Sequence, residues 1–259
     1  MTDQILVQRD GTIATVTLNR PEKLNAMTKP MWLRLGEVMG ELSADDRVRC
    51  IVVTGAGVKS FSPGNDISEF ETERSNVEQA RAYGKILHGT LDTIRACRHP
   101  TVAMIRGICV GGGLEIAGLC DLRICGESSR FGIPINRLGL VMAYPEIEVL
   151  ISLVGRSVAL EILLEGRVFG ADEAKEMGLV SRVVADAEVE TEAFETARRI
   201  ADGAPLVARW HKKFARRLAE PGPLTAEELD EGYACYGTED FQTGYKAFLA
   251  KTKPEFKGR

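Results

Sequence analysis

The sequence predicts an α/β protein organised around a largely parallel β-sheet. Strand-like and helix-like patterns alternate over about the first 145 residues, and residues 50–54 read CIVVT, an almost continuously apolar run. Such a run is typical of a strand buried on both faces, as found in parallel sheets that are covered by helices. The chain has 259 residues, of which 44% are hydrophobic, so it is long enough to bury a sizeable core.

Local signals justify the individual elements. Asp10-Gly11 lies between two short strand-like runs within residues 4–19, which is a signal for a β-hairpin. Thr28 and Pro30 suit the N-cap and the first turn of a helix. Further strands are expected at 50–54, 101–105 and 121–124, with an irregular segment at 61–67. Helices are expected at 30–42, 77–97, 145–164, 171–177, 187–202, 205–219 and 224–250.

The pattern changes towards the C-terminus. After about residue 145 only residues 179–184 resemble a strand, and beyond about residue 200 the patterns are helical throughout. We therefore divide the chain into an α/β core, residues 1–200, and a C-terminal helical region, residues 201–259.

Composition restricts the class of function. The formal net charge of −4 disfavours a nucleic-acid partner. There is no apolar run of membrane-spanning length and no N-terminal basic region followed by an apolar one, so we expect a cytoplasmic protein without membrane association. The six cysteines form no C-x-x-C pair and the three histidines lie far apart in the sequence, so no metal site is expected.

The main candidates for catalytic residues lie between residues 100 and 124. A strand-like run leads to three consecutive glycines, Gly111, Gly112 and Gly113, and then to a helical pattern that contains Glu115. Glycines let a ligand approach the main chain, and the first N–H groups of a helix are unpaired and suit an oxyanion. Backbone donors beside one carboxylate indicate acyl-group chemistry. The alternative is structural: tightly packed glycines, and an acid that the helix dipole favours.

Several segments together resemble the crotonase family, also called the enoyl-CoA hydratase/isomerase superfamily, over almost the whole chain. The segments that carry the resemblance are residues 19–26 (NRPEKLNA), 61–67 (FSPGNDI), 107–115, 120–124 (CDLRI), 131–134 (FGIP), 138–139, 171–174, 178–180 and 248–256. The resemblance implies a fold of ββα units with two nearly perpendicular sheets and a C-terminal helical region that builds homotrimers, often paired into hexamers. It also implies acyl-CoA thioesters as substrates, with coenzyme A as part of the substrate and no separate cofactor.

The resemblance assigns a catalytic role to three residues. The backbone N–H groups of Asn65 and Gly112 match the pair that binds the thioester oxygen as it becomes an enolate, and Glu115 matches the first catalytic glutamate. Preorganised donors of this kind stabilise charge that develops only in the transition state.

Other residues match the coenzyme A cradle of the family. The resemblance implies contacts with the substrate from Lys23, Leu24, Ala26, Pro63, Gly64, Asp66, Ile67 and Gly111. Asp66 could instead hold the loop in place. Lys59 and, from a neighbouring subunit, Lys251 fall where family members place phosphate-binding lysines; otherwise they are solvated surface charges.

The chain departs from the family pattern at the second catalytic glutamate. Where hydratases have a Pro-Glu pair, this chain has Pro134-Ile135. We expect an apolar wall there, a pKa of Glu115 raised by burial, and no second acid coupled to it. Tyr144 or Glu146 could supply a replacement acid, or Pro145 could begin a helix in which Glu146 is a first-turn acid.

Three functions remain open at this stage. The first is hydration or dehydration of an enoyl-CoA with Glu115 as the single acid/base. The second is a decarboxylase or a specialised isomerase of acyl-CoA, since these need the oxyanion site more than two carboxylates. The third is a non-catalytic acyl-CoA binding or scaffold protein.

Overall fold

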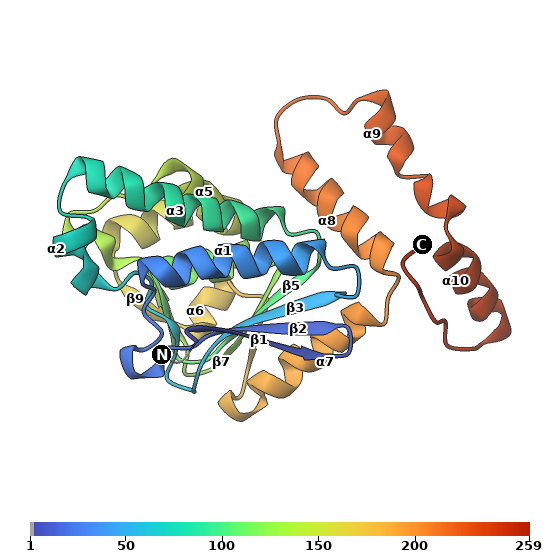
Figure 1. Cartoon of the computed structure of the whole chain (residues 1–259), viewed down its shortest axis with the longest axis horizontal. Helices are drawn as coiled ribbons and strands as arrows, with labels where there is room; N and C mark the ends of the chain where they lie inside the picture. Colours follow the sequence, from blue (N-terminus) through green and yellow to red (C-terminus); the bar gives the residue numbers. More distant parts are fainter. Residues whose placement is uncertain (1–2) are drawn as a thin grey trace.

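Two β-sheets form the centre of the molecule (Figure 1). The structure is a computed structural model, and it describes residues 3–259. The larger sheet has the order β1 (Ile5–Asp10), β2 (Ile13–Leu18), β3 (Cys50–Gly55), β5 (Thr101–Ile105), β7 (Leu122–Gly126), β10 (Arg182–Val184). Its neighbouring strands are parallel apart from the β1–β2 hairpin. The smaller sheet has the order β4 (Ser60–Ser62), β6 (Ile108–Val110), β8 (Arg130–Gly132), β9 (Val168–Gly170).

Helices cover both faces of the larger sheet. In Figure 1, α1 and α3 lie on one side of this sheet and α7 lies on the other, while α8, α9 and α10 project away from the body. The α-helices are α1 (Lys29–Ala44), α2 (Phe70–Glu73), α3 (Val77–Ala96), α4 (Gly112–Leu119), α5 (Tyr144–Glu165), α6 (Ala171–Glu176), α7 (Val189–Ala201), α8 (Pro205–Ala219), α9 (Ala226–Glu231) and α10 (Glu239–Ala250). The α/β class and the two sheets are confirmed.

Strand β3 shows why the sheet lies between two layers. All of its residues are buried. Ile51 and Val53 belong to the core cluster formed with α1 and α3, whereas Cys50 and Val52 belong to the cluster formed with α7. Alternate residues of a strand point to opposite faces, so a continuously apolar strand requires apolar helices on both sides.

Several predicted elements are confirmed, and others need correction. The hairpin turns at Asp10-Gly11, and the Thr28 hydroxyl accepts a hydrogen bond from the N–H of Met31 at the start of α1. Residues 61–67 are not wholly irregular, because β4 ends at Ser62. Strands β6, β8 and β9 were not predicted. Each has three residues, too few for a period-two pattern to be visible.

The predicted helix at 224–250 is also wrong as one element. It is divided into α9, a 3₁₀ turn at Ala234–Gly237, and α10. The Thr238 hydroxyl accepts a hydrogen bond from the N–H of Phe241 at 3.0 Å, so a new helix starts there with its own cap. The boundary proposed between residues 200 and 201 stays a prediction.

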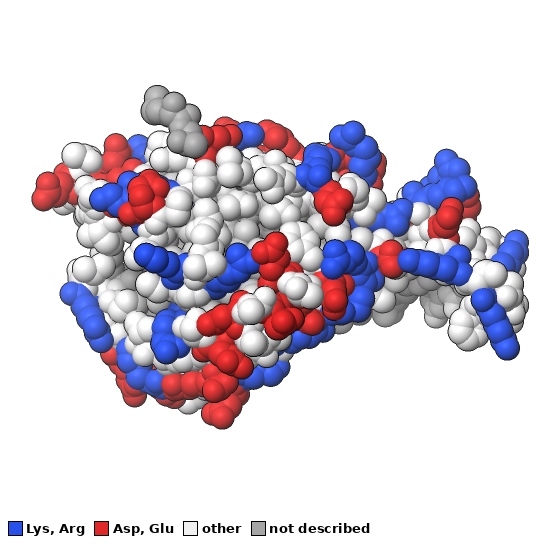
Figure 2. Space-filling model, turned by 90° about the horizontal axis from the view of Figure 1, so that it is seen from below, with Lys and Arg blue, Asp and Glu red and all other residues white. Residues whose placement is uncertain are grey.

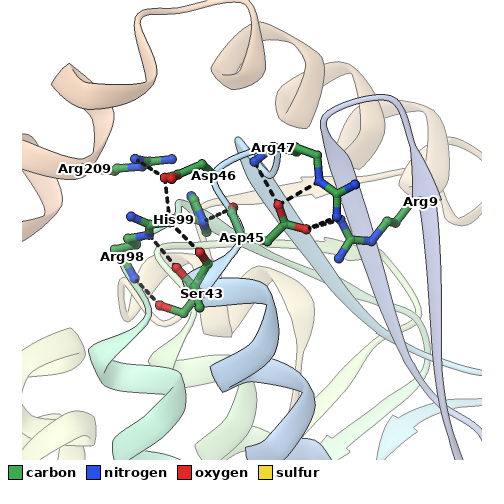
Figure 3. A network of polar contacts seen from close by, with 9 residues as sticks. Arg9, Ser43, Asp45, Asp46, Arg47, Arg98, His99 and Arg209 are labelled. Atoms are coloured by element: carbon green, nitrogen blue, oxygen red, sulfur yellow. Dashed lines mark hydrogen bonds and ion pairs between the residues drawn. The ribbon is translucent and has the colours of Figure 1, made fainter. Parts of the chain in front are cut away.

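Polar contacts attach α8 to the body. Asp46 accepts hydrogen bonds from Arg98 at 2.8 Å and from Arg209 of α8 at 3.3 Å, with His99 directly alongside (Figure 3). Lys212 of α8 forms an ion pair with Asp121 at 2.7 Å. Figure 2 shows basic and acidic side chains interspersed on the face seen from below, and the projecting helices at one end. None of the helices among residues 3–259 is both long and apolar enough to cross a membrane.

Buried His99 makes the stability of this junction depend on pH. Its Nε2–H donates to the Asp45 carbonyl at 3.1 Å, and its Nδ1 has no partner within residues 3–259. Burial, together with the charges of Arg209 and Arg98, lowers the pKa of His99 to about 4. The unfolded chain, with an ordinary histidine pKa of about 6.5, therefore binds more protons than the folded chain between these values.

We expect this histidine to remove about 3 kcal/mol of stability as the pH falls from about 6.5 to about 4. In His99→Gln, which keeps a donor for the Asp45 carbonyl, that part of the pH dependence should be absent. Urea unfolding of both proteins at pH 7 and at pH 4.5 measures the difference. Equal losses of stability in the two proteins would contradict the assignment.

Candidate active site

The segment around Gly64 lies directly against the first residue of α4. Gly64 has φ +89, and a Cβ added to it would be only 2.4 Å from the backbone nitrogen of Gly112. The N-cap of α4 is Gly111, at φ +50, and no side chain caps this helix end. The contact therefore requires glycine at position 64. It places the backbone around Gly64 directly beside the first residue of α4.

The two predicted oxyanion donors are adjacent to this contact. Within residues 3–259, the N–H groups of Asn65 and Gly112 donate to no protein acceptor. The Asn65 side chain is fixed, because its Oδ1 accepts from Trp32 Nε1 at 2.8 Å and from the Tyr83 hydroxyl at 3.3 Å. Both N–H groups therefore lack a protein acceptor within residues 3–259, and the side chain of Asn65 is anchored.

Glu115 lies in the first turn of α4. Its Oε2 is buried and has no hydrogen-bond partner within the described residues. Burial, and then the negative charge of Glu146, raise the pKa of Glu115 to about 8, while the positive charge of Arg74 opposes them. A carboxyl group with such a pKa can both take up and release a proton near neutral pH.

Glu146 corrects the expectation that Glu115 has no second acid near it. Helix α5 packs against α4, where a Cβ at Gly118 would lie 3.4 Å from both Val149 and Leu153. This packing brings Glu146, near the start of α5, within electrostatic range of Glu115. The Glu146 carboxylate accepts from the N–H of Ala143 at 2.7 Å and contacts His88 Nε2 at 2.8 Å.

Both alternatives weighed for Glu146 thus have a structural basis. It is a first-turn acid that caps α5, as the sequence pattern indicates, and its charge also reaches Glu115. Tyr144, in contrast, is 92% exposed and is not among the buried groups around Glu115.

A second cluster of predicted residues surrounds the loop after β2. A cavity of about 320 Å³ is lined by Leu24 and Lys59, among others. Asn25, which sequence reasoning missed, fixes this loop by donating to the carbonyl oxygens of Ala56 at 3.1 Å and Ser60 at 2.7 Å. Its φ of +63 is the kind of backbone strain that asparagine tolerates, but that conformation is not visible in the sequence.

Asp66 holds the loop that carries Asn65. It forms an ion pair with Arg20 at 2.5 Å and accepts from the Ser68 hydroxyl at 2.7 Å. These bonds lower the pKa of Asp66 to about 2. Of the two roles considered for this residue, the structure therefore favours positioning of the loop.

The remaining predicted contacts are spread over the chain. Lys23 and Ile67 are exposed, Ala26 is buried, and the Pro63 carbonyl oxygen lies 3.3 Å from where a Cβ on Gly111 would be. Lys251 ends α10, in the projecting region and away from the sheets (Figure 1).

Comparison with known proteins identifies the family. The profile described as enoyl-CoA hydratase/isomerase matches residues 8–259. The chain belongs to this family. The crotonase resemblance is therefore confirmed across the chain.

Relatives of this enoyl-CoA hydratase/isomerase chain carry hydratase names. It is 33% identical to a short-chain-enoyl-CoA hydratase of Clostridium acetobutylicum over 99% of both chains. It is 32% identical to a crotonyl-CoA hydratase of Syntrophomonas wolfei over 98% of both. Among solved structures, an "enoyl-CoA hydratase/carnithine racemase" from Magnetospirillum magneticum is 50% identical, with a TM-score of 0.98 over 100% of this chain and 97% of that one.

The resemblance places Ile135 at the position of the second glutamate, which stays a prediction. Ile135 is partly buried and packs against the main hydrophobic core. Its side chain can neither donate nor accept a proton. The charges that act on the pKa of Glu115 are those of Glu146 from α5 and Arg74 from the segment before α3.

Proposed function

We propose that this protein is an acyl-CoA enzyme that hydrates an enoyl-CoA, or dehydrates the product, by stabilising a thioester enolate. The observation that carries the proposal is Glu115, a half-buried carboxyl group whose buried Oε2 has no partner within the described residues. Its pKa is raised to about 8, and it lies in the first turn of a helix whose first N–H groups have no side-chain cap. The hydratase names of the relatives support the reaction type.

The proposed mechanism uses three residues. The N–H groups of Asn65 and Gly112 donate to the thioester oxygen and stabilise its negative charge as the enolate forms. Ionised Glu115 takes a proton from a water molecule, whose oxygen bonds to the β-carbon of the double bond. Protonated Glu115 then gives a proton to the α-carbon, which restores the thioester and the ionised carboxylate.

The substrate cradle follows from the family. In this proposal coenzyme A, as part of the substrate, contacts the loop of Lys23, Leu24 and Ala26 together with residues 63–67, and Lys59 binds a phosphate. Lys251, at the end of the projecting region, reaches the cradle of a neighbouring copy, so the active form is a homotrimer or a pair of trimers. No separate cofactor takes part.

Crotonyl-CoA tests this function directly. Loss of the enoyl-thioester absorbance on mixing with the purified protein, with formation of a 3-hydroxyacyl-CoA, is the expected result. Absence of turnover would count against hydration. Loss of carboxylate from a malonyl-type thioester would then favour the decarboxylase that Ile135 also suits, and tight binding without turnover of any thioester would favour a binding protein.

We expect Glu146→Gln to shift the pH profile of hydration. In this mechanism Glu115 acts ionised, so kcat/KM for hydration should rise with pH through a value near 8. Glutamine keeps an acceptor for the N–H of Ala143 but removes the negative charge, so the rise should move to lower pH.

The same variant separates two roles of Glu146. If it only tunes Glu115, the maximal rate should stay within a few-fold of the unmodified enzyme. A loss of about 10²-fold or more at every pH would mean that Glu146 itself transfers a proton. An unchanged profile would contradict the electrostatic contact between the two carboxyl groups.

A further inference from the structure

Arg74 is a half-buried cation that forms no ion pair with any acid within residues 3–259. It lies between α2 and α3, with the carbon of its guanidinium group 4.6 Å from the ring centroid of Phe70 and 4.8 Å from that of Tyr83. The two rings hold the planar group in place by cation–π contacts. Its Nη1 is buried and has no hydrogen-bond partner within residues 3–259.

Two acids close to Arg74 in the sequence, Glu69 and Glu73, are engaged elsewhere. Glu73 forms an ion pair with Lys29 at 2.6 Å. Glu69 accepts from the N–H of Lys29 at 3.0 Å and from the Tyr83 hydroxyl at 3.2 Å. A buried donor without a partner is costly, so an acceptor on a ligand that reached Arg74 Nη1 would be favourable.

Tyr83 connects Arg74 to the proposed reaction centre, because its ring centroid lies 4.8 Å from the guanidinium carbon and its hydroxyl lies 3.3 Å from Asn65 Oδ1. The positive charge of Arg74 lowers the pKa of Glu115, so the two groups are within electrostatic range. They are nevertheless not paired: Glu115 Oε2 and Arg74 Nη1 both lack a partner. The single Tyr83 hydroxyl proton is shared between Glu69 at 3.2 Å and Asn65 Oδ1 at 3.3 Å, so the residue that stacks on Arg74 also contacts the loop of the oxyanion donor.

We propose that Arg74 binds a carboxylate at the acyl end of the substrate, so that the preferred substrates are thioesters of dicarboxylic acids. This inference rests on the proposed function, which places the thioester oxygen at Asn65 and Gly112 and the reacting carbons beside Glu115. A carboxylate attached beyond those carbons meets the free guanidinium edge, and its planar shape matches that group. The two neighbouring aromatic rings lower the local polarity, which strengthens such an ion pair.

Binding of two matched probes tests the inference. Crotonyl-CoA is compared with glutaconyl-CoA, which is crotonyl-CoA with a carboxylate on its terminal carbon. Dissociation constants are measured by calorimetry in a Glu115→Gln background, so that turnover does not interfere, and kcat/KM is measured with Glu115 present. We expect glutaconyl-CoA to bind at least about tenfold more tightly than crotonyl-CoA.

Variants of Arg74 then identify the residue responsible. Arg74→Met keeps an unbranched side chain without the charge. We expect it to raise the dissociation constant of glutaconyl-CoA at least about thirtyfold, while the dissociation constant of crotonyl-CoA changes less than about twofold. Arg74→Lys keeps the charge without the planar guanidinium group. Its affinity for glutaconyl-CoA should lie between those of the protein with Arg74 and of Arg74→Met. The control is Arg81→Met, on the exposed face of α3, which should change neither constant.

The outcomes separate this inference from the function on which it rests. Turnover of crotonyl-CoA with no preference for glutaconyl-CoA would overturn the role of Arg74 and leave the hydratase proposal intact. Equal weakening of both probes in Arg74→Met and Arg74→Lys would also overturn it, because Arg74 would then only support the loop. Failure of the unmodified protein to bind either thioester would overturn the proposed function, and this inference with it.

Discussion

Glu115→Gln should lower the rate of enoyl-CoA hydration by about 10²- to 10⁴-fold, the range that a positioned acid/base contributes. Glutamine has nearly the same shape, so the dissociation constant for the thioester should change little. The amide cannot exchange a proton with water or with the α-carbon. The measurement is single-turnover hydration of crotonyl-CoA, together with calorimetric binding of the same thioester.

The stability of Glu115→Gln provides an internal control. Because burial raises the pKa of Glu115 above its unfolded value, the folded protein loses stability as the pH rises through that raised value. The variant has no such group, so it should be more stable than the unmodified protein at pH 9. Low activity with this gain in stability would identify a functional residue. Activity within a few-fold of the unmodified enzyme would remove Glu115 from the mechanism.

The parts of the fold that local patterns determine could be predicted from the sequence. The hairpin at Asp10-Gly11, the cap at Thr28 and the fully buried strand β3 each follow from a few neighbouring residues. The strands of the smaller sheet could not be predicted, because β6, β8 and β9 are three residues long and are defined by their partners. Tertiary pairing, rather than propensity, creates such strands.

The same distinction applies to the candidate site. Gly111, Gly112 and Glu115 are consecutive or nearly so, and the sequence alone points to them. The approach of Glu146 to Glu115, 31 residues apart in the chain, depends on how α5 packs on α4. The contacts of Arg74 with two aromatic rings depend on the turn into α3. Neither arrangement has a local signal. These two charges nonetheless modify the pKa of Glu115 that burial raises, and in our inference Arg74 selects the substrate.

Gly64→Ala should be as damaging as the loss of Glu115, although it removes no functional group. The added methyl group would lie 2.4 Å from the backbone nitrogen of Gly112, and the residue would have to keep a φ of +89. The segment of Asn65 and the start of α4 must therefore move apart, so the two N–H groups no longer converge on one oxygen. Each such donor contributes about 10²- to 10³-fold to the rate, so we expect kcat to fall at least by that factor.

Gly11→Ala separates geometry from backbone strain. Gly11 has φ +56 in the hairpin turn, and a Cβ there would have no atom within 4 Å. It should cost only about 1 kcal/mol of stability, with kcat unchanged. Urea unfolding and hydration kinetics are measured for Gly64→Ala and for Gly11→Ala. If Gly64→Ala stays folded and keeps kcat within about threefold, the contact between Gly64 and Gly112 does not form an oxyanion site. A large loss of kcat in Gly64→Ala alone would show that the spacing of two backbone segments, held by a glycine, is what the reaction requires.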